Sequence, residues 1–256
     1  MRYLILSLLF CWSSVGQDLF WPALNLSIPQ SASTSVPNYP TNDTAGYPRY
    51  VWYAGEDYSP TSGDWTDRMG LYNLSSASGK RPSGGTQNSL QTVSFDGTDD
   101  YLRSTAYTNS NGNPMEYIIA AKKRSSTTGI KCLFHGYQFD PSHRAYWDEQ
   151  EFRFGTGSGL SNMGGELKTN EWFVISLPFS STAGTYSYTN YNSQWLYQQY
   201  ASSAANGITW GAYYQNTAAW APIDIAEIIV YATNLTDTVR SYVYQYLTNK
   251  WNISLP

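Results

Sequence analysis

The fold of this chain is decided by the segment Ile225-Ala226-Glu227-Ile228-Ile229-Val230-Tyr231. A run of this composition, apolar and mostly β-branched, is typical of a β-strand. Side chains alternate between the two faces of a strand, so Glu227 is a carboxylate on an otherwise apolar face. We interpret Glu227 as the partner of a nearby cation or hydroxyl group, because a buried charge needs one. A functional glutamate is the alternative.

The residues after this strand predict one amphipathic helix. Apolar side chains recur at intervals of three, four and one: Val239, Val243, Tyr246, Leu247 and Trp251. This spacing places them on one side of a helix. Thr236 is a suitable N-cap, Asp237 lies in the first turn and Lys250 lies in the last turn, where each charge suits the helix dipole. Such a helix would pack against a sheet and seal one edge of the sandwich.

Ten short segments predict the strands. Each alternates Val, Ile, Tyr, Phe or Trp with other residues between clusters of Gly, Asn, Ser and Asp: 50–54, 91–95, 116–121, 131–137, 151–155, 172–178, 185–189, 194–200, 208–214 and 223–231. Strands of this length fit two stacked sheets. The expected fold is all-β, a two-sheet antiparallel sandwich with one C-terminal amphipathic helix, over residues 49–256.

The N-terminus has the composition of a secretory signal peptide. Residues 1–16 contain one arginine, the apolar block Leu4–Trp12 and small residues up to Gly16, the order that such signals share. A buried N-terminal helix is the alternative. Residues 17–48 are rich in Pro, Ser and Thr and predict a linker or a strap over the domain. We therefore expect a protein that is secreted or displayed on an extracellular surface.

The composition indicates a surface that is polar but weakly charged. Fifteen Lys and Arg stand against nineteen Asp and Glu, a formal charge of −4 that argues against nucleic acid as a partner. Charged residues are 13% of the chain, about half of the usual ~25%, whereas 16% are aromatic. Mean hydropathy is −0.43, and no apolar run after the signal reaches the ~20 residues that span a membrane.

Two residue types bear on covalent chemistry. Five asparagines match the acceptor pattern for N-linked glycans, which a secreted eukaryotic chain would carry and a bacterial one would not: Asn25, Asn42, Asn73, Asn234 and Asn252. Cys11 lies within the signal, so the mature chain has no internal disulfide. We interpret Cys132 as a small core residue on the same strand face as Ile130 and Phe134. A reactive thiol is the alternative.

Three blocks of sequence together resemble a known superfamily. They are Val51-Trp52-Tyr53-Ala54-Gly55, Phe95-Asp96-Gly97-Thr98-Asp99-Asp100-Tyr101-Leu102, and the closing strand with its helix ending in Tyr246-Leu247-Thr248-Asn249-Lys250-Trp251. This chain resembles the concanavalin A-like lectin/glucanase superfamily, in particular its laminin G-like jelly-roll domains. The resemblance covers residues 49–253 and implies a jelly-roll fold. It leaves the function open among lectins, adhesion modules, glycosidases, lyases and spacers.

The second block contains a candidate metal site. Asp96, Asp99 and Asp100 are close in sequence and offer oxygens of the kind that calcium prefers. Their spacing matches no defined calcium loop, so we interpret them as residues that form a reverse turn. Calcium binding is the alternative, and otherwise we expect no cofactor.

The test for catalysis rests on two glutamates. Retaining glucanases need two carboxyl groups ~5–5.5 Å apart, and Glu149 and Glu151 would share one face of a strand at a spacing of two residues. Gln150 faces away and no third acid follows on that face. A glycan-cleaving hydrolase or lyase is therefore the alternative hypothesis, and we predict no catalytic residue.

The main hypothesis is recognition by aromatic side chains in loops, because Tyr and Trp rings suit stacking on sugars. The candidate ligand-binding residues lie before the strand at Glu151 and around the loop 215–219: Tyr146, Trp147, Asp148, Tyr213, Tyr214 and Trp220. The expected partner is carbohydrate or an extracellular protein. A structural surface or virion component without a small ligand is a further alternative.

Overall fold

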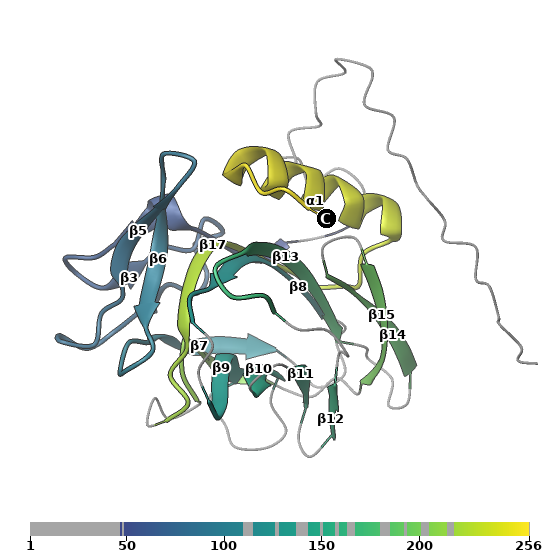
Figure 1. Ribbon diagram of the computed structural model, residues 1–256, viewed down its shortest axis with the longest axis horizontal. Coiled ribbons are helices and arrows are strands. Elements are labelled where there is room, and N and C mark those ends of the chain that lie inside the picture. The colour runs from purple at the N-terminus through teal and green to yellow at the C-terminus, as the bar shows by residue number, and fades with distance from the viewer. Residues whose placement is uncertain are drawn as a thin grey trace, which may run out of the picture. The chain divides into compact units, whose positions relative to one another are not determined.

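Two antiparallel β-sheets, named A and B here, and one C-terminal α-helix make up the folded domain (Figure 1). The computed structural model describes Tyr47 and residues 49–109, 115–125, 128–136, 143–148, 151–156, 159–162, 167–179, 185–191, 194–200, 205–213 and 218–255. The predicted sandwich with its terminal helix is confirmed. The predicted signal, Asn25 and Asn42 lie outside the described residues, as does all of the segment 17–48 except Tyr47.

Sheet A is built around the strand that contains the segment Ile225–Tyr231. In spatial order it consists of β15 (Gln194–Tyr200), β14 (Thr185–Tyr191), β13 (Trp172–Phe179), β8 (Met115–Lys123), β17 (Pro222–Tyr231), β6 (Leu90–Asp96) and β5 (Ser83–Gln87). β1 (Arg49–Ala54) pairs with the second half of β17, beyond the part that β6 covers. Every residue of β17 is buried, because the strand has neighbours on both edges and layers on both faces.

Sheet B is the second layer of the sandwich. Its order is β12 (Gly159–Asn162), β11 (Glu151–Thr156), β10 (His143–Asp148), β9 (Ile130–Gly136), β16 (Ala205–Trp210), β7 (Leu102–Asn109), β4 (Leu74–Ser75), β3 (Asp64–Trp65) and β2 (Tyr58–Ser59). A 3₁₀ turn, Gly55–Asp57, joins β1 to β2. Figure 1 shows β9, β10, β11 and β12 on the side of sheet A that is opposite the helix.

The core between the sheets is aromatic. Its largest fully buried side chains include Phe95, Tyr117, Phe134, Trp147 and Trp210. The rings of Tyr117 and Phe134 stack with centroids 4.9 Å apart. One polar chain enters this core, in which the Tyr117 hydroxyl bonds the Tyr107 hydroxyl at 2.7 Å and Nδ1 of His143 at 3.1 Å. Such bonds satisfy polar groups that would otherwise be costly to bury.

The helix α1 (Asp237–Trp251) covers the outer face of sheet A. Val243, Leu247 and Trp251 are buried against Ile118 and Ile229 of the sheet, as the apolar spacing predicted. The predicted cap is also confirmed, because the Thr236 side chain accepts a hydrogen bond from the backbone N–H of Val239. The part of the chain that the structure describes contains no helix long and apolar enough to cross a membrane.

Glu227 anchors the C-terminal end of this helix. Its side chain is fully buried and accepts four hydrogen bonds: from Trp52 Nε1 (2.6 Å), the Tyr246 hydroxyl (2.9 Å), Lys250 Nζ (2.8 Å) and Trp251 Nε1 (2.8 Å). Each carboxylate oxygen therefore has two donors. The interpretation of Glu227 as the partner of a cation and a hydroxyl group is confirmed.

Glu116 anchors the other end of the helix in the same way. It is fully buried on β8 and accepts hydrogen bonds from Nε and Nη2 of Arg240, which lies in the first turns of α1. The Ser176 hydroxyl and the backbone N–H of Leu235 donate to the same carboxylate. The helix is thus held to the sheet at both ends by a buried carboxylate whose hydrogen-bonding capacity is filled.

We predict that Glu227→Gln lowers the free energy of unfolding by roughly 3–5 kcal/mol, because it breaks a buried ion pair. The new amide NH₂ group would also face N–H and O–H donors that now bond to the carboxylate. Urea unfolding followed by tryptophan fluorescence measures the change. The control is Glu171→Gln, which removes a carboxylate from an exposed pair with Lys168 and should cost under about 0.5 kcal/mol. Equal effects of the two substitutions would contradict the anchoring role.

Candidate ligand-binding face

The outer face of sheet B, the side away from the inter-sheet core, presents a row of polar side chains. The strand registers place five residues from neighbouring strands directly opposite one another: Ser75, Arg103, Thr209, His135 and Arg144. Their sequence neighbours point the other way and belong to the apolar core: Leu102, Trp210, Phe134 and Ala145. The alternation of a strand therefore makes one face apolar and the other polar across five strands.

The middle of this row is covered and its ends are partly open. Thr209 and His135 are fully buried, whereas Arg103 and Arg144 are half-buried. The half-buried ring of Tyr213 lies against His135, with ring centroids 4.4 Å apart. Nδ1 of His135 donates to the carbonyl of Gly136 at 2.6 Å, and burial lowers the pKa of His135 to about 4. This imidazole is therefore neutral at pH 7.

A second row on the same face contains Arg153, Tyr146 and Cys132, which are cross-strand partners. Arg153 forms an ion pair with the exposed Glu151, Nη2 to Oε2 at 2.6 Å. Tyr146 is 8% exposed, so little of its ring is open to a ligand. Together the two rows give this face three arginines, one neutral histidine and partly covered tyrosine rings.

The predicted loop Tyr146–Asp148 is wrong, because these residues form the end of β10. Trp147 is 1% exposed and belongs to the core between the sheets, where it presents no ring to a ligand. Asp148 is half-buried and lies directly opposite Glu151 across the β10–β11 hairpin. The prediction had begun the strand at Glu151, whereas the structure has a strand on each side of the hairpin.

The two predicted ligand-binding segments nevertheless meet at β9. Cys132 of β9 pairs with Tyr146 on one side, and its backbone N–H donates to the carbonyl of Ala219 at 2.8 Å on the other. Tyr213 and Trp220, on the same connection as Ala219, are both half-buried. Tyr214 lies outside the described residues. The aromatic side chains predicted as a site therefore come from neighbouring positions, although only some of them face outward.

The expected orientation of Cys132 is also wrong. A β-bulge shifts the register between Ala145 and Tyr146, so that Phe134 pairs with Ala145 but Cys132 pairs with Tyr146. The bulge adds one residue to β9. The Cys132 side chain therefore points to the outer face of the sheet, whereas the Phe134 side chain points to the core. The thiol is still buried, at 1% exposure, and burial raises its pKa well above the ordinary value. Its predicted lack of reactivity is consistent with that pKa.

Of the two glutamates in the hydrolase hypothesis, Glu151 alone lies among the described residues. Glu149 lies outside the described residues, and Glu151 forms an ion pair with Arg153. Within the described residues, Asp96, Asp99 and Asp100 form a close cluster of side chains of metal-binding types, and they lie on the turn between β6 and β7.

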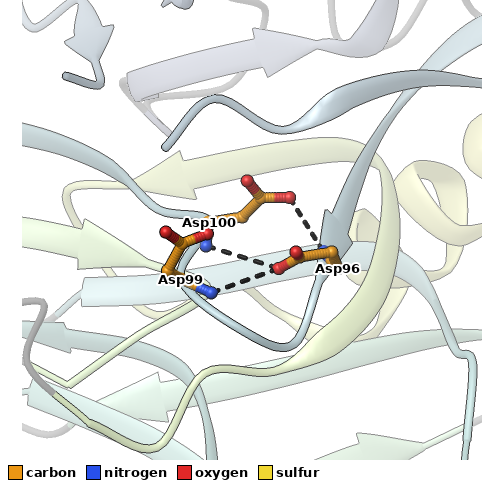
Figure 2. Close-up of side chains that lie close together, drawn as sticks. All are labelled: Asp96, Asp99 and Asp100. Carbon is orange, nitrogen blue, oxygen red and sulfur yellow. Dashed lines mark hydrogen bonds between the residues drawn. The ribbon is translucent and has the colours of Figure 1, made fainter. Parts of the chain in front are cut away.

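That acidic cluster is a hydrogen-bonded turn, as Figure 2 shows. Oδ1 of Asp96 accepts the backbone N–H groups of Thr98 (2.7 Å), Asp99 (3.3 Å) and Asp100 (3.4 Å). Oδ2 of Asp100 accepts the N–H of Asp96 at 2.9 Å. Gly97 has a positive φ of 80°, which this turn requires. Burial, and next the neighbouring aspartates, raise the pKa of Asp100 to about 6.

The described candidate glycosylation sites differ in accessibility. Asn73 and Asn252 are exposed. Asn234 is half-buried, and in the orientation that satisfies its amide, the nitrogen donates to the carbonyls of Phe179 and Met115 at 3.1 and 3.2 Å. An attached glycan would replace one of these donor hydrogens. The fold is therefore open to modification at Asn73 and Asn252, but not at Asn234.

Comparison with known proteins finds similar solved structures, but no family model and no curated protein sequence matches this chain. The binding domain of Botulinum neurotoxin serotype G is similar, with a TM-score of 0.59 and 11% identity over 80% of this chain and 54% of that one. The binding domain of Botulinum neurotoxin DC in complex with SialylT gives 0.55 and 8% over 78% and 51%.

A sialidase of Trypanosoma rangeli, in complex with the inhibitor DANA, is also similar, with a TM-score of 0.57 and 12% identity over 78% of this chain and 33% of that one. The chain thus spans about half the length of the neurotoxin binding domains and a third of the sialidase. At these identities the likeness shows the fold, a β-sandwich, and nothing finer.

We predict that acid destabilises the fold through its histidines. Burial lowers the pKa of His143 to about 3 and that of His135 to about 4, so below pH ~6.5 the unfolded chain binds protons that the folded chain does not. The free energy of unfolding should fall by up to about 1.4 kcal/mol per pH unit for each histidine. Asp100 acts in the opposite direction, because its raised pKa makes the folded chain more stable as the pH falls from about 6. It is one group against two histidines.

Urea unfolding at pH 7, 6 and 5 measures this dependence. His143→Gln removes one of the two groups, so the variant should lose less stability between pH 6 and pH 5 than the wild type does. An identical pH slope in both proteins would show that His143 is not held neutral by burial.

Proposed function

We propose that this chain is a non-catalytic recognition module that binds carbohydrate on the outer face of sheet B. One observation carries this proposal. The outer face of sheet A is sealed by α1, whereas the outer face of sheet B has a polar row across five strands, with the ring of Tyr213 beside it. Polar groups around a partly open ring suit the hydroxyls and the apolar faces of a sugar.

The family assignment is part of the same proposal. We place the chain in the concanavalin A-like superfamily, close to the laminin G-like domains. The blocks 95–102 and 225–251 and the β-sandwich fold support this assignment. The similar solved structures include a receptor-binding toxin domain in complex with SialylT and a sialidase. Their names favour carbohydrate over a protein surface as the partner.

The proposed setting is extracellular. Removal of residues 1–16 would start the mature chain at Gln17, and the exposed Asn73 and Asn252 would carry glycans in a eukaryotic host. Expression of the full chain in a eukaryotic secretion host tests both points. We expect protein in the medium whose N-terminal sequence begins at Gln17 and whose tryptic peptides carry glycans at Asn73 and Asn252 but not at Asn234. Retention in the cell with residues 1–16 intact would contradict the proposal.

A glycan array with the mature chain tests the binding function. For the saccharide that binds best, Tyr213→Ala should raise Kd about tenfold, because it removes the ring beside the polar row. The control is Tyr242→Ala, which removes an exposed ring from α1 on the other side of sheet A and should leave Kd unchanged.

The other outcomes decide between the alternatives. An array without any bound saccharide would overturn the proposal in favour of a structural component or a protein-binding module. Release of reducing ends from a bound polysaccharide, lost on Glu151→Gln, would replace it with the hydrolase hypothesis. Equal effects of the Tyr213 and Tyr242 substitutions would place the binding surface elsewhere.

A further inference from the structure

Arg144 is a cation on the proposed binding face with no counter-ion among the described residues. It lies on β10 in the polar row, opposite His135, and is half-buried. Its Nε is shielded from solvent and has no hydrogen-bond acceptor. Among the described residues no carboxylate lies within 4.0 Å of this guanidinium. A cation that loses water without gaining a partner destabilises the free protein.

Several other arginines of this chain are paired with carboxylates, whereas Arg81, whose Nε is also shielded and without an acceptor, donates to the carbonyl of Thr61. Arg240 bonds Glu116, Arg68 bonds Asp57, and Arg153 bonds Glu151. The fold thus provides a carboxylate for each of these guanidinium groups, including one on the same face and the neighbouring strand. Among the described residues, Arg144 thus differs from these three paired arginines.

The described neighbours of Arg144 do not compensate its charge. Its cross-strand partner His135 is neutral, and the Cys132 thiol on the same face stays protonated. Glu151 is already engaged by Arg153, and Asp148 lies four residues further along β10. The whole chain has a formal charge of −4, so a positive site here depends on local placement and not on net charge.

We infer that Arg144 is the counter-ion for an anionic group of the ligand, a carboxylate or a sulfate on an acidic saccharide. This inference rests on the proposed carbohydrate-binding function and specifies its ligand class. A guanidinium can bind either oxyanion through two parallel hydrogen bonds. Arg103 lies in the same row three strands away, about 14 Å between backbones.

The test is an array that presents each saccharide backbone in three forms, neutral, sialylated and sulfated, for example lactose, 3′-sialyllactose and 3′-sulfolactose. We expect the acidic forms to bind with a Kd at least about tenfold lower than the neutral form, as for a charge-assisted hydrogen-bonded contact. Arg144→Gln should abolish the preference, and Arg144→Lys should keep part of it. The control Lys168→Gln removes an exposed cation paired with Glu171 and should leave the preference unchanged.

The thermal midpoint separates a ligand-binding role from a structural one. Arg144→Gln should leave the midpoint of the free protein unchanged or raise it, because the substitution removes an uncompensated charge. A lower midpoint would mean that the guanidinium stabilises the fold and would overturn its role as a ligand counter-ion. Thermal unfolding of the wild type with the acidic saccharide should show a higher midpoint, which Arg144→Gln should not show.

The binding outcomes distinguish this inference from the proposed function. Equal affinity for neutral and acidic forms would overturn the inference and leave carbohydrate binding intact. An acid preference that survives Arg144→Gln would also overturn it, because another group would then hold the anion. An array without any bound saccharide would overturn both. A preference for the sialylated or for the sulfated form would identify which oxyanion the site accepts.

Discussion

The structure depends on two buried carboxylates that hold the C-terminal helix on sheet A. Glu116 and Glu227 lie on neighbouring central strands, and each accepts hydrogen bonds from several elements that are distant in sequence. A charge in this position would be destabilising if any of its partners were missing, so the arrangement ties the helix, β1 and the sheet into a single cooperative layer. The apolar side chains of α1 then cover the outer face of the sheet.

The outer face of sheet A and the outer face of sheet B therefore differ in what covers them. Sheet A is enclosed by an apolar layer on each side, so its residues are committed to packing. Sheet B has one apolar face and one face of arginines, a histidine, a threonine and tyrosines, of which the arginines and Tyr213 are partly open. Recognition chemistry in a sandwich of this kind therefore belongs to sheet B, and the anchored helix belongs to stability.

Much of the fold was predictable from the sequence, but little of the site was. The run Ile225–Tyr231 and the spacing from Val239 to Trp251 are local patterns, and the structure follows them. The polar row was missed because Arg103, Arg144 and Thr209 lie far apart in the chain, and only the strand registers bring them together. The bulge in β9 reversed the face of Cys132, since a register shift of one residue reverses every side chain beyond it. Asp67 gave no signal either, although it accepts four backbone N–H groups and fixes a whole loop.

The position of β17 has a consequence for how the polypeptide reaches this structure. It lies between β8 and β6 and also pairs with β1, yet it follows every other described strand along the chain. During synthesis, the partners of β17 must therefore wait with their edges unpaired until almost the entire domain has left the ribosome. Contacts between such distant segments form slowly, and open aromatic strands are prone to aggregate. Until the last strand is inserted, these unpaired edges are therefore the part of the nascent domain most exposed to wrong pairing.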